Sequence, residues 1–148
     1  ARSPSKTIKL ARELRKKYIC SFIDINSEYF VNHILTMKAY CDGMCYDGYL
    51  WDCLANPKVI SKECAHQIIQ SMEDFYVMWD IHSCEKIFVP NYWKYPKTSI
   101  LFVENWADLL ELTLPEDIYL FDDSFTRSVI FTHETDDEDN PYCIECSR

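Results

Sequence analysis

The spacing of hydrophobic residues follows a helical period in the first half of the chain and a two-residue period in the second half. In residues 4–18 apolar positions recur every three or four residues after a Ser-Pro pair, which is typical of a helix start. Similar apolar stripes occur within residues 27–73, where Asn26 or Ser27, and later Ser61, are candidate N-caps. These patterns predict a basic N-terminal helix at 4–18 and a helical layer at 27–73.

Two segments of this first half are short. Ile19 to Ile25 is an apolar run that fits either a strand or an extended lead-in to the next helix. A brief helix is predicted to begin at Asp47-Gly48, with Leu50 and Cys53 facing inward. It is expected to stop at Asn56-Pro57, because a residue before proline avoids helical geometry.

A β-hairpin is predicted at 117–134, within a sheet-rich part that covers residues 75–134. Its first arm, IYLF at 118–121, is apolar on both faces, which is typical of an inner strand. The turn-forming residues DDS at 122–124 connect it to a second arm. In that arm side chains alternate, so Val129, Phe131 and His133 are expected on one face.

The remaining pattern completes the fold prediction. A second hairpin is expected from Phe75 to Val89, followed by a strand at 99–103 and a short helix at 106–112. Helices thus mostly precede strands, which predicts an α+β fold with N-terminal helices packed on a mostly antiparallel sheet of about five strands. The length fits one domain at 1–148, ending in an acidic, cysteine-containing tail at 135–148.

Charge is distributed unevenly over the chain, whose net charge is −9. Residues 1–17 hold seven Lys or Arg and one Glu, which leaves eight basic and 23 acidic residues for the rest, a net charge of −15. The basic helix could bind RNA or an anionic membrane, or pack back on the acidic body. The acidic remainder repels nucleic acid and attracts basic partners, although a solvated acidic face is the simpler alternative.

Eight cysteines permit either disulfides or a metal site. The basic start lacks the apolar segment of a secretory signal, so reduced thiols and a cytoplasmic location are expected unless a signal has been removed. A membrane helix needs a run of about 18 apolar residues, and this sequence contains no such run. The spacing of Cys143 and Cys146 suits two thiolates on one zinc ion, and Cys41 with Cys45 would complete four ligands. A zinc-stabilised interaction domain is therefore one alternative; otherwise the chain is expected to fold without a cofactor.

Catalytic groups are sparse in the sequence. His33 and His66 lie in predicted helices and are expected to be structural, whereas His82 and His133 lie at a turn and a strand end. No nucleophile signature accompanies them, and two glycines are too few for a glycine-rich phosphate loop. A metal-dependent or hydrolytic enzyme that uses His82, His133 and nearby carboxylates is the alternative hypothesis.

An aromatic loop between Pro90 and Pro96 alternates with lysines, a pattern that also suits nucleic-acid stacking. Because the rest of the chain is acidic, this loop is expected either to cap the core or to present Trp93 and Tyr95 as anchors to a protein partner.

The run YVMWDIHSCEKIFVPNYWKYPKTSILFV, followed by LPEDIYLFDDSFTRSVIFTHE, resembles a group of small uncharacterised bacterial proteins. In size and acidity the chain is also similar to immunity proteins of polymorphic toxin and contact-dependent inhibition systems. That resemblance implies a cytoplasmic protein that neutralises a cognate toxin, such as a basic nuclease, without binding nucleic acid or membrane itself. The expected contacts are acids and two aromatic anchors: Asp122, Asp123, Glu134, Asp136, Asp137, Glu138, Asp139, Trp93 and Tyr95.

Overall fold

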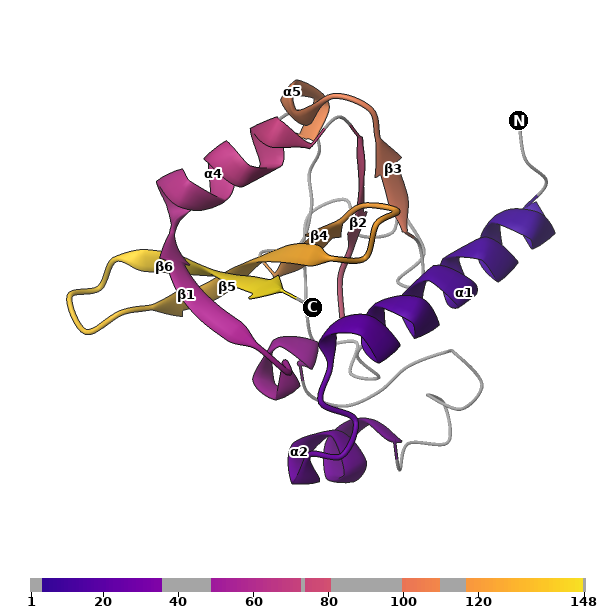
Figure 1. Ribbon diagram of the computed structural model, residues 1–148, viewed down its shortest axis with the longest axis horizontal. Helices are drawn as coiled ribbons and strands as arrows, with labels where there is room; N and C mark the ends of the chain where they lie inside the picture. The colour runs from indigo at the N-terminus through magenta and orange to yellow at the C-terminus, as the bar shows by residue number, and fades with distance from the viewer. Residues whose placement is uncertain (1–3, 36–48, 73, 81–99, 110–116, 148) are drawn as a thin grey trace.

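The computed structural model describes residues 4–35, 49–72, 74–80, 100–109 and 117–147, and its described strands form one antiparallel sheet (Figure 1). The strand order is β1-β6-β5-β4-β2-β3. The strands are β1 (Pro57–Ser61), β2 (Phe75–Met78), β3 (Leu101–Val103), β4 (Ile118–Phe121), β5 (Arg127–Thr135) and β6 (Pro141–Ser147). Every pairing is antiparallel, which confirms the predicted α+β class.

Helical segments cover both faces of this sheet. The first face carries α1 (Pro4–Phe22), α2 (Glu28–Phe30), the π-helical turn η1 (Val31–Leu35) and the 3₁₀ turn η2 (Leu50–Cys53). The second face carries α4 (Lys62–Ser71) and α5 (Trp106–Leu109). Ser27 and Ser61 cap α2 and α4 by accepting a hydrogen bond from a backbone N–H of the first turn, as the sequence predicts. None of the described helices is long and apolar enough to cross a membrane.

The alternation of side chains along the strands divides the hydrophobic core in two. The first core cluster, beneath α1, α2 and η2, is rich in aromatic rings; it includes Tyr18, Phe22, Phe30, Leu50, Met78, Tyr119, Phe121 and Ile130. The second core cluster, beneath α4 and α5, is mostly aliphatic: Ala65, Ile69, Phe75, Val77, Val103, Ile118, Leu120, Val129 and Cys143. Because β4 faces both clusters, it is the inner strand that its pattern predicts.

Helix α1 is longer than its sequence pattern predicts. It continues through Ile19 to Phe22, so most of the apolar run at 19–25 is the last helical turn, and Ile23 then bridges to Leu54. The basic face is interrupted as well: Arg15 is buried and donates from Nη1 to the carbonyl of Trp79 at 2.9 Å. Packing against the sheet fixes this helix to the body of the protein.

Strands β1 and β6 were not predicted. β1 lies between the helix expected to end at Asn56-Pro57 and the helix expected to begin at Ser61, and β6 lies in the acidic, cysteine-containing tail; no strand was expected at either place. β6 is inserted between β1 and β5, where Ile144 pairs with Val59 on one side and Ile130 on the other. Only the turn before β6, residues 136–140, is exposed as expected.

The hairpin at 117–134 is confirmed, with Leu120 of β4 paired to Val129 of β5. A register shift between Phe131 and Thr135 breaks the alternation near the end of β5. As a result, His133 contacts Tyr49 and Trp51 beside the first core cluster, and the prediction that it shares a face with Val129 and Phe131 was wrong.

The strand at 99–103 and the helix at 106–112 are confirmed where they are described, as β3 and α5. Of the second predicted hairpin, the first arm is described and forms β2. Its turn and its second arm lie outside the described residues. His82 and the aromatic loop with Trp93 and Tyr95 lie outside them, and so do Cys41 and Cys45.

Candidate functional site

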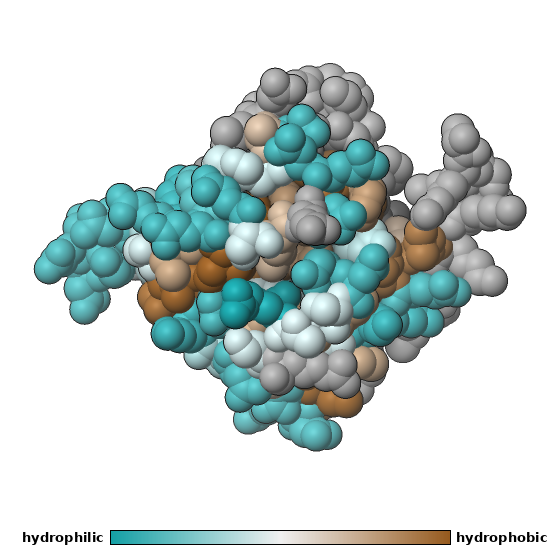
Figure 2. All heavy atoms as spheres, turned by 45° about the horizontal axis from the view of Figure 1, so that its top comes forward, coloured by the Kyte–Doolittle hydropathy of each residue, from teal (hydrophilic) through white to brown (hydrophobic). Residues whose placement is uncertain are grey.

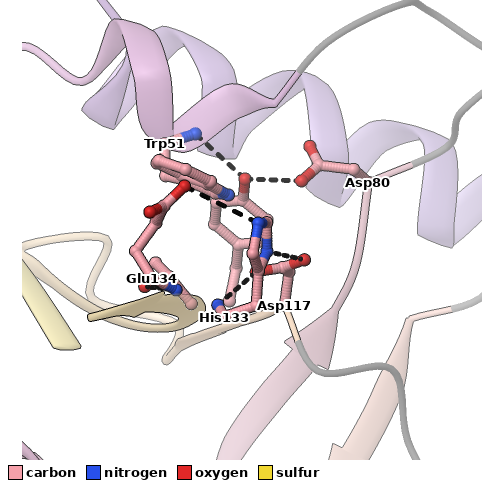
Figure 3. Close-up of polar contacts among 7 residues, drawn as sticks. Trp51, Asp80, Asp117, His133 and Glu134 are labelled. Atoms are coloured by element: carbon pink, nitrogen blue, oxygen red, sulfur yellow. Dashed lines mark hydrogen bonds and ion pairs between the residues drawn. The ribbon is translucent and has the colours of Figure 1, made fainter. Parts of the chain in front are cut away.

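The end of β5 brings an imidazole between carboxylates. Asp117, just before β4, accepts hydrogen bonds from the backbone N–H of His133 at 2.8 Å and contacts its ring Nδ1 through both oxygens at 2.9 Å. Nε2 of the same ring lies 3.6 Å from Glu134, and Figure 3 shows the two carboxylates on different sides of the imidazole. Asp117 therefore fixes the ring orientation of His133 while 39% of that side chain stays exposed.

Three consecutive backbone amides hold the neighbouring segment in place. A helix start leaves its first backbone amides without intrahelical partners. The N–H groups of Tyr49, Leu50 and Trp51 therefore need acceptors from elsewhere in the protein. Side-chain oxygens of Tyr29, Asp80 and Tyr119 accept from these amides in that order, at 3.0, 3.0 and 2.9 Å. The acceptors come from α2, the end of β2 and β4, so three elements determine where η2 begins.

Asp80 is the centre of this arrangement. It is buried, and its second oxygen accepts a 2.7 Å hydrogen bond from the hydroxyl of Tyr119, which in turn binds the Trp51 amide (Figure 3). A buried carboxylate is stabilised only when hydrogen bonds replace its lost hydration. Asp80 therefore links the sheet to η2 and sets the position of Trp51.

Rings from η2 and β5 pack together at this end of the sheet. The centroids of Tyr49 and Trp51 are 5.0 Å apart, and His133 lies 5.7 Å from the first and 5.9 Å from the second. Tyr49 and Trp51 are half-buried. The rings thus form a fixed aromatic surface that remains partly open to solvent.

Asp52 adds a further carboxylate to the cluster. Its partial desolvation raises its pKa, the hydrogen bond from Tyr29 lowers it, and the charge of Glu134 raises it again. Burial also raises the pKa of Tyr29 to about 12, and the nearby charge of Asp52 contributes to that rise. Tyr29 stacks on His33 at 4.6 Å, which brings His33 to the same end of the molecule.

The turn between β5 and β6 extends the acidic character of this end. Asp136 Oδ1 accepts hydrogen bonds from the amides of Glu138 and Asn140, both at 2.9 Å, and Asp139 adopts a positive φ of 62°. Asp side chains support such turns and tolerate the left-handed region. The loop projects from the body and its visible surface is hydrophilic (Figures 1 and 2). We call this turn together with Asp52, Asp117 and Glu134 the acidic end.

Asp122 and Asp123 lie elsewhere. They form the turn at the opposite end of β5, which spans nine residues, or roughly 30 Å at the usual rise per residue. There they line an open hollow of about 520 Å³ with Asp74 and Arg127, and Asp123 accepts a hydrogen bond from Tyr76. The ammonium of Lys17, from basic α1, lies 4.6 Å from the Phe125 ring of the same turn. The structure therefore separates the seven predicted acidic contacts into two groups.

The geometry excludes Cys143 and Cys146 as a zinc-binding pair. Both lie in β6, where residues three apart point to opposite faces, and each belongs to a different core cluster. Burial raises the pKa of both thiols, that of Cys143 to about 11, whereas zinc requires thiolates. The described cysteines are all free thiols, and no group of three or more potential metal ligands occurs within the described ranges.

The histidines divide between packing and the site. His66 stacks on Trp106 and Phe131 next to the second core cluster, in agreement with its expected structural role. His33 is exposed rather than embedded in a helical core. His133 is the predicted candidate that the structure places in a polar cluster.

Sequence reasoning found His133, Glu134 and the acidic turn but missed the groups that surround them. Asp117 was detectable, since it stands at the start of the hairpin opposite His133. Tyr49, Trp51 and Asp80 carry no such local signal, because tertiary contacts alone bring them together. Comparison of the chain with models of known families, with curated proteins and with solved structures finds no significant match. The functional interpretation therefore depends on the site itself.

Proposed function

We propose that this chain is a cytoplasmic immunity protein that binds and neutralises a cognate protein toxin. The observation that carries the proposal is the acidic end, where carboxylates surround a partly exposed aromatic surface on a rigid support. Aromatic side chains dominate the binding energy of protein interfaces, while complementary charge accelerates association. A basic nuclease domain is the partner that this combination fits best.

The proposed interface centres on one end of the sheet. It comprises the aromatic rings of Tyr49 and Trp51 together with the acidic end: Asp52, Asp117, Glu134, Asp136, Asp137, Glu138 and Asp139. A nuclease cleft that accepts a phosphate backbone presents basic side chains, so these acids match its charge. Asp122 and Asp123 lie too far away to share the centre of the same contact.

The first test is capture of the tagged protein from its native cell, with identification of the chains that co-purify. The captured toxin domain is then purified and assayed for growth inhibition with and without this protein. We expect stoichiometric binding and loss of toxicity. A captured chain whose activity is unchanged by this protein, or repeated capture of nothing, would contradict the proposal.

Charge reversal then locates the interface. The variant E134K/D137K/E138K should slow association at low salt by about tenfold or more and flatten its salt dependence, because electrostatic steering contributes one to three orders of magnitude to association rates. The matched control, D122K/D123K, changes charge at the other end of β5 and should bind nearly as fast as the unmodified protein. Equal effects of the two variants would remove the acidic end from the interface.

The contact between Asp117 and His133 favours a hydrolytic enzyme as the second candidate. A carboxylate that fixes an imidazole through Nδ1 is also how general bases are oriented in hydrolases. Release of product from ester or phosphodiester substrates, abolished in H133A and retained in H66A, would support that candidate. If the purified protein hydrolyses these substrates no faster than background, the enzyme candidate is rejected and toxin binding remains the explanation of the site.

A further inference from the structure

We propose that the aromatic surface of Tyr49 and Trp51, beside Asp52 and Glu134, accepts an arginine side chain of the partner. This inference rests on the proposed function and specifies the chemistry of its central contact. It follows from the geometry of the rings, the state of the carboxylates and the rigidity of the segment that carries them.

The rings supply the first part of the argument. Tyr49 and Trp51 lie 5.0 Å apart with an interplanar angle of 34°, and His133 meets Trp51 edge-on at 76°. Tyr49 and Trp51 are both half-buried, so each residue keeps part of its surface exposed to solvent. Cations bind over the faces of Trp and Tyr rings, with Trp the strongest, and arginine does so most often because its planar guanidinium stacks on them.

The carboxylates supply the second part. Asp117 already holds two donors, the backbone N–H and the ring Nδ1 of His133. Asp52 accepts a single 3.2 Å hydrogen bond from Tyr29, and the side chain of Glu134 is 46% exposed at 3.6 Å from the imidazole. A carboxylate offers about four lone-pair sites, so Asp52 and Glu134 retain capacity for more donors. A guanidinium has five N–H donors in a planar fork that matches this demand.

The electrostatic state of the pair agrees with such a ligand. The charge of Glu134 contributes to the raised pKa of Asp52, so the two carboxylates repel one another in the unbound protein. A cation placed beside both relieves that repulsion. A metal ion is the poorer match, because the described residues contain no cluster of three potential ligands.

Rigidity supplies the last part. The backbone amides of Tyr49 and Trp51 donate hydrogen bonds to Tyr29 and Tyr119. Asp117 fixes the imidazole of His133, which packs against both rings. Binding therefore orders little of this protein, which lowers the entropic cost of the contact.

The test is an NMR titration of the full chain with the peptide acetyl-Gly-Arg-Gly-amide. The control peptide carries citrulline, which has the shape of arginine without its charge. We expect the indole N–H signal of Trp51, assigned by its loss in W51F, to shift and saturate with a Kd of about millimolar, as expected for one stacked cation with two exposed ion pairs. Citrulline should produce no saturable shift.

Two further variants distinguish a specific site from diffuse attraction. D52N and E134Q should each weaken peptide binding by up to about fivefold, the upper range for an exposed ion pair, whereas D122N/D123N should leave the Kd unchanged. A shift with citrulline, no shift of Trp51, or equal loss in D122N/D123N would overturn the proposal. Because the peptide assay needs no toxin, its failure would leave toxin neutralisation open, and failure to capture a toxin would leave the arginine site intact.

Discussion

The two faces of the sheet differ in the number of polar groups that are buried with their apolar side chains. On the first face the core contains the hydroxyls of Tyr18 and Tyr119, and the buried polar residues Arg15, Asp80 and Ser128 bond to groups in or next to it. On the second face the cluster holds hydrocarbon side chains and one thiol. The candidate site lies on the first face, where Asp80 and Tyr119 hold their hydrogen-bond partners in fixed positions. We infer that the second face mainly contributes to the stability of the fold. The first face also determines where the residues of the candidate site lie.

The largest expected effect comes from the second face. Ile69→Ala in α4 removes a fully buried side chain and should lower the free energy of unfolding by about 2–5 kcal/mol, because the cavity is only partly refilled. Urea denaturation measures this loss. The arginine peptide should still shift Trp51 in the folded variant. Loss of that shift together with stability would show that the two faces are not separable.

Asp80→Ala should produce the converse result on the first face. It removes the acceptor for the Leu50 amide and for the Tyr119 hydroxyl, and the expected cost is about 2–3 kcal/mol since both partners are buried. In contrast to Ile69→Ala, this variant should also weaken arginine-peptide binding. Asp123→Asn is the matched control for an exposed acceptor and should change stability by less than about 0.5 kcal/mol. Unchanged peptide binding in Asp80→Ala would show that Asp80 does not determine the position of Trp51.

The pH dependence of stability tests the thiols on both faces. Burial raises the pKa of Cys143 from 9.0 to about 11 and that of Cys53 to about 12, so the folded state holds these protons more tightly than the unfolded state. The stabilisation is therefore fully present below about pH 9 and is lost as the pH rises toward 11 and beyond.

We expect the free energy of unfolding to fall by about 2 kcal/mol for each of these thiols between pH 9 and 11. Cys143→Ala should reduce this slope relative to the unmodified protein. Urea denaturation across that pH range measures both slopes. A stability that rises with pH would contradict the buried state of these thiols.

The smallest predicted effect concerns a single hydroxyl of the first face. Tyr18 bonds to Ser128 at 2.6 Å, and Ser128 donates to the carbonyl of Leu120. Tyr18→Phe should cost about 1 kcal/mol, as for one buried hydrogen bond, because Ser128 keeps its other partner. Tyr142→Phe, at a half-buried ring beside the same cluster, serves as the control in thermal denaturation. Equal stability of the two variants would show that this buried bond adds nothing.

The central hairpin could be predicted from the sequence because its signals are local. Alternation in IYLF and the DDS turn both fall within a few residues, and the caps Ser27 and Ser61 act within one helical turn. β1 and β6 lack such signals. β1 is short and largely exposed, and β6 combines proline, glutamate and cysteine in a run with weak alternation. Their pairing is a tertiary event between distant parts of the chain.

The candidate site shows the same division. His133 and Glu134 were recognised from their place at a strand end, yet the bulge that turns His133 toward Trp51 has no distinct residue pattern. Arg15 belongs to the basic N-terminal helix, and packing of that helix on the sheet buries it and brings it to the carbonyl of Trp79, 64 residues away in sequence. Periodicity predicts which side of an element is apolar, but it does not predict which other element will cover its polar side.

The position of β6 has a consequence for how the molecule assembles. Among the described strands, β1 pairs only with β6, and β6 pairs with β5 on its other side. The local β4–β5–β6 meander can form early, whereas β1 must wait for a partner from much later in the sequence, a contact that closes a long loop and slows folding. The amides of β1 should therefore exchange with solvent through a partial opening that leaves β4 and β5 protected. We therefore expect β1, at one edge of the described sheet, to fold late and to open before β4 and β5.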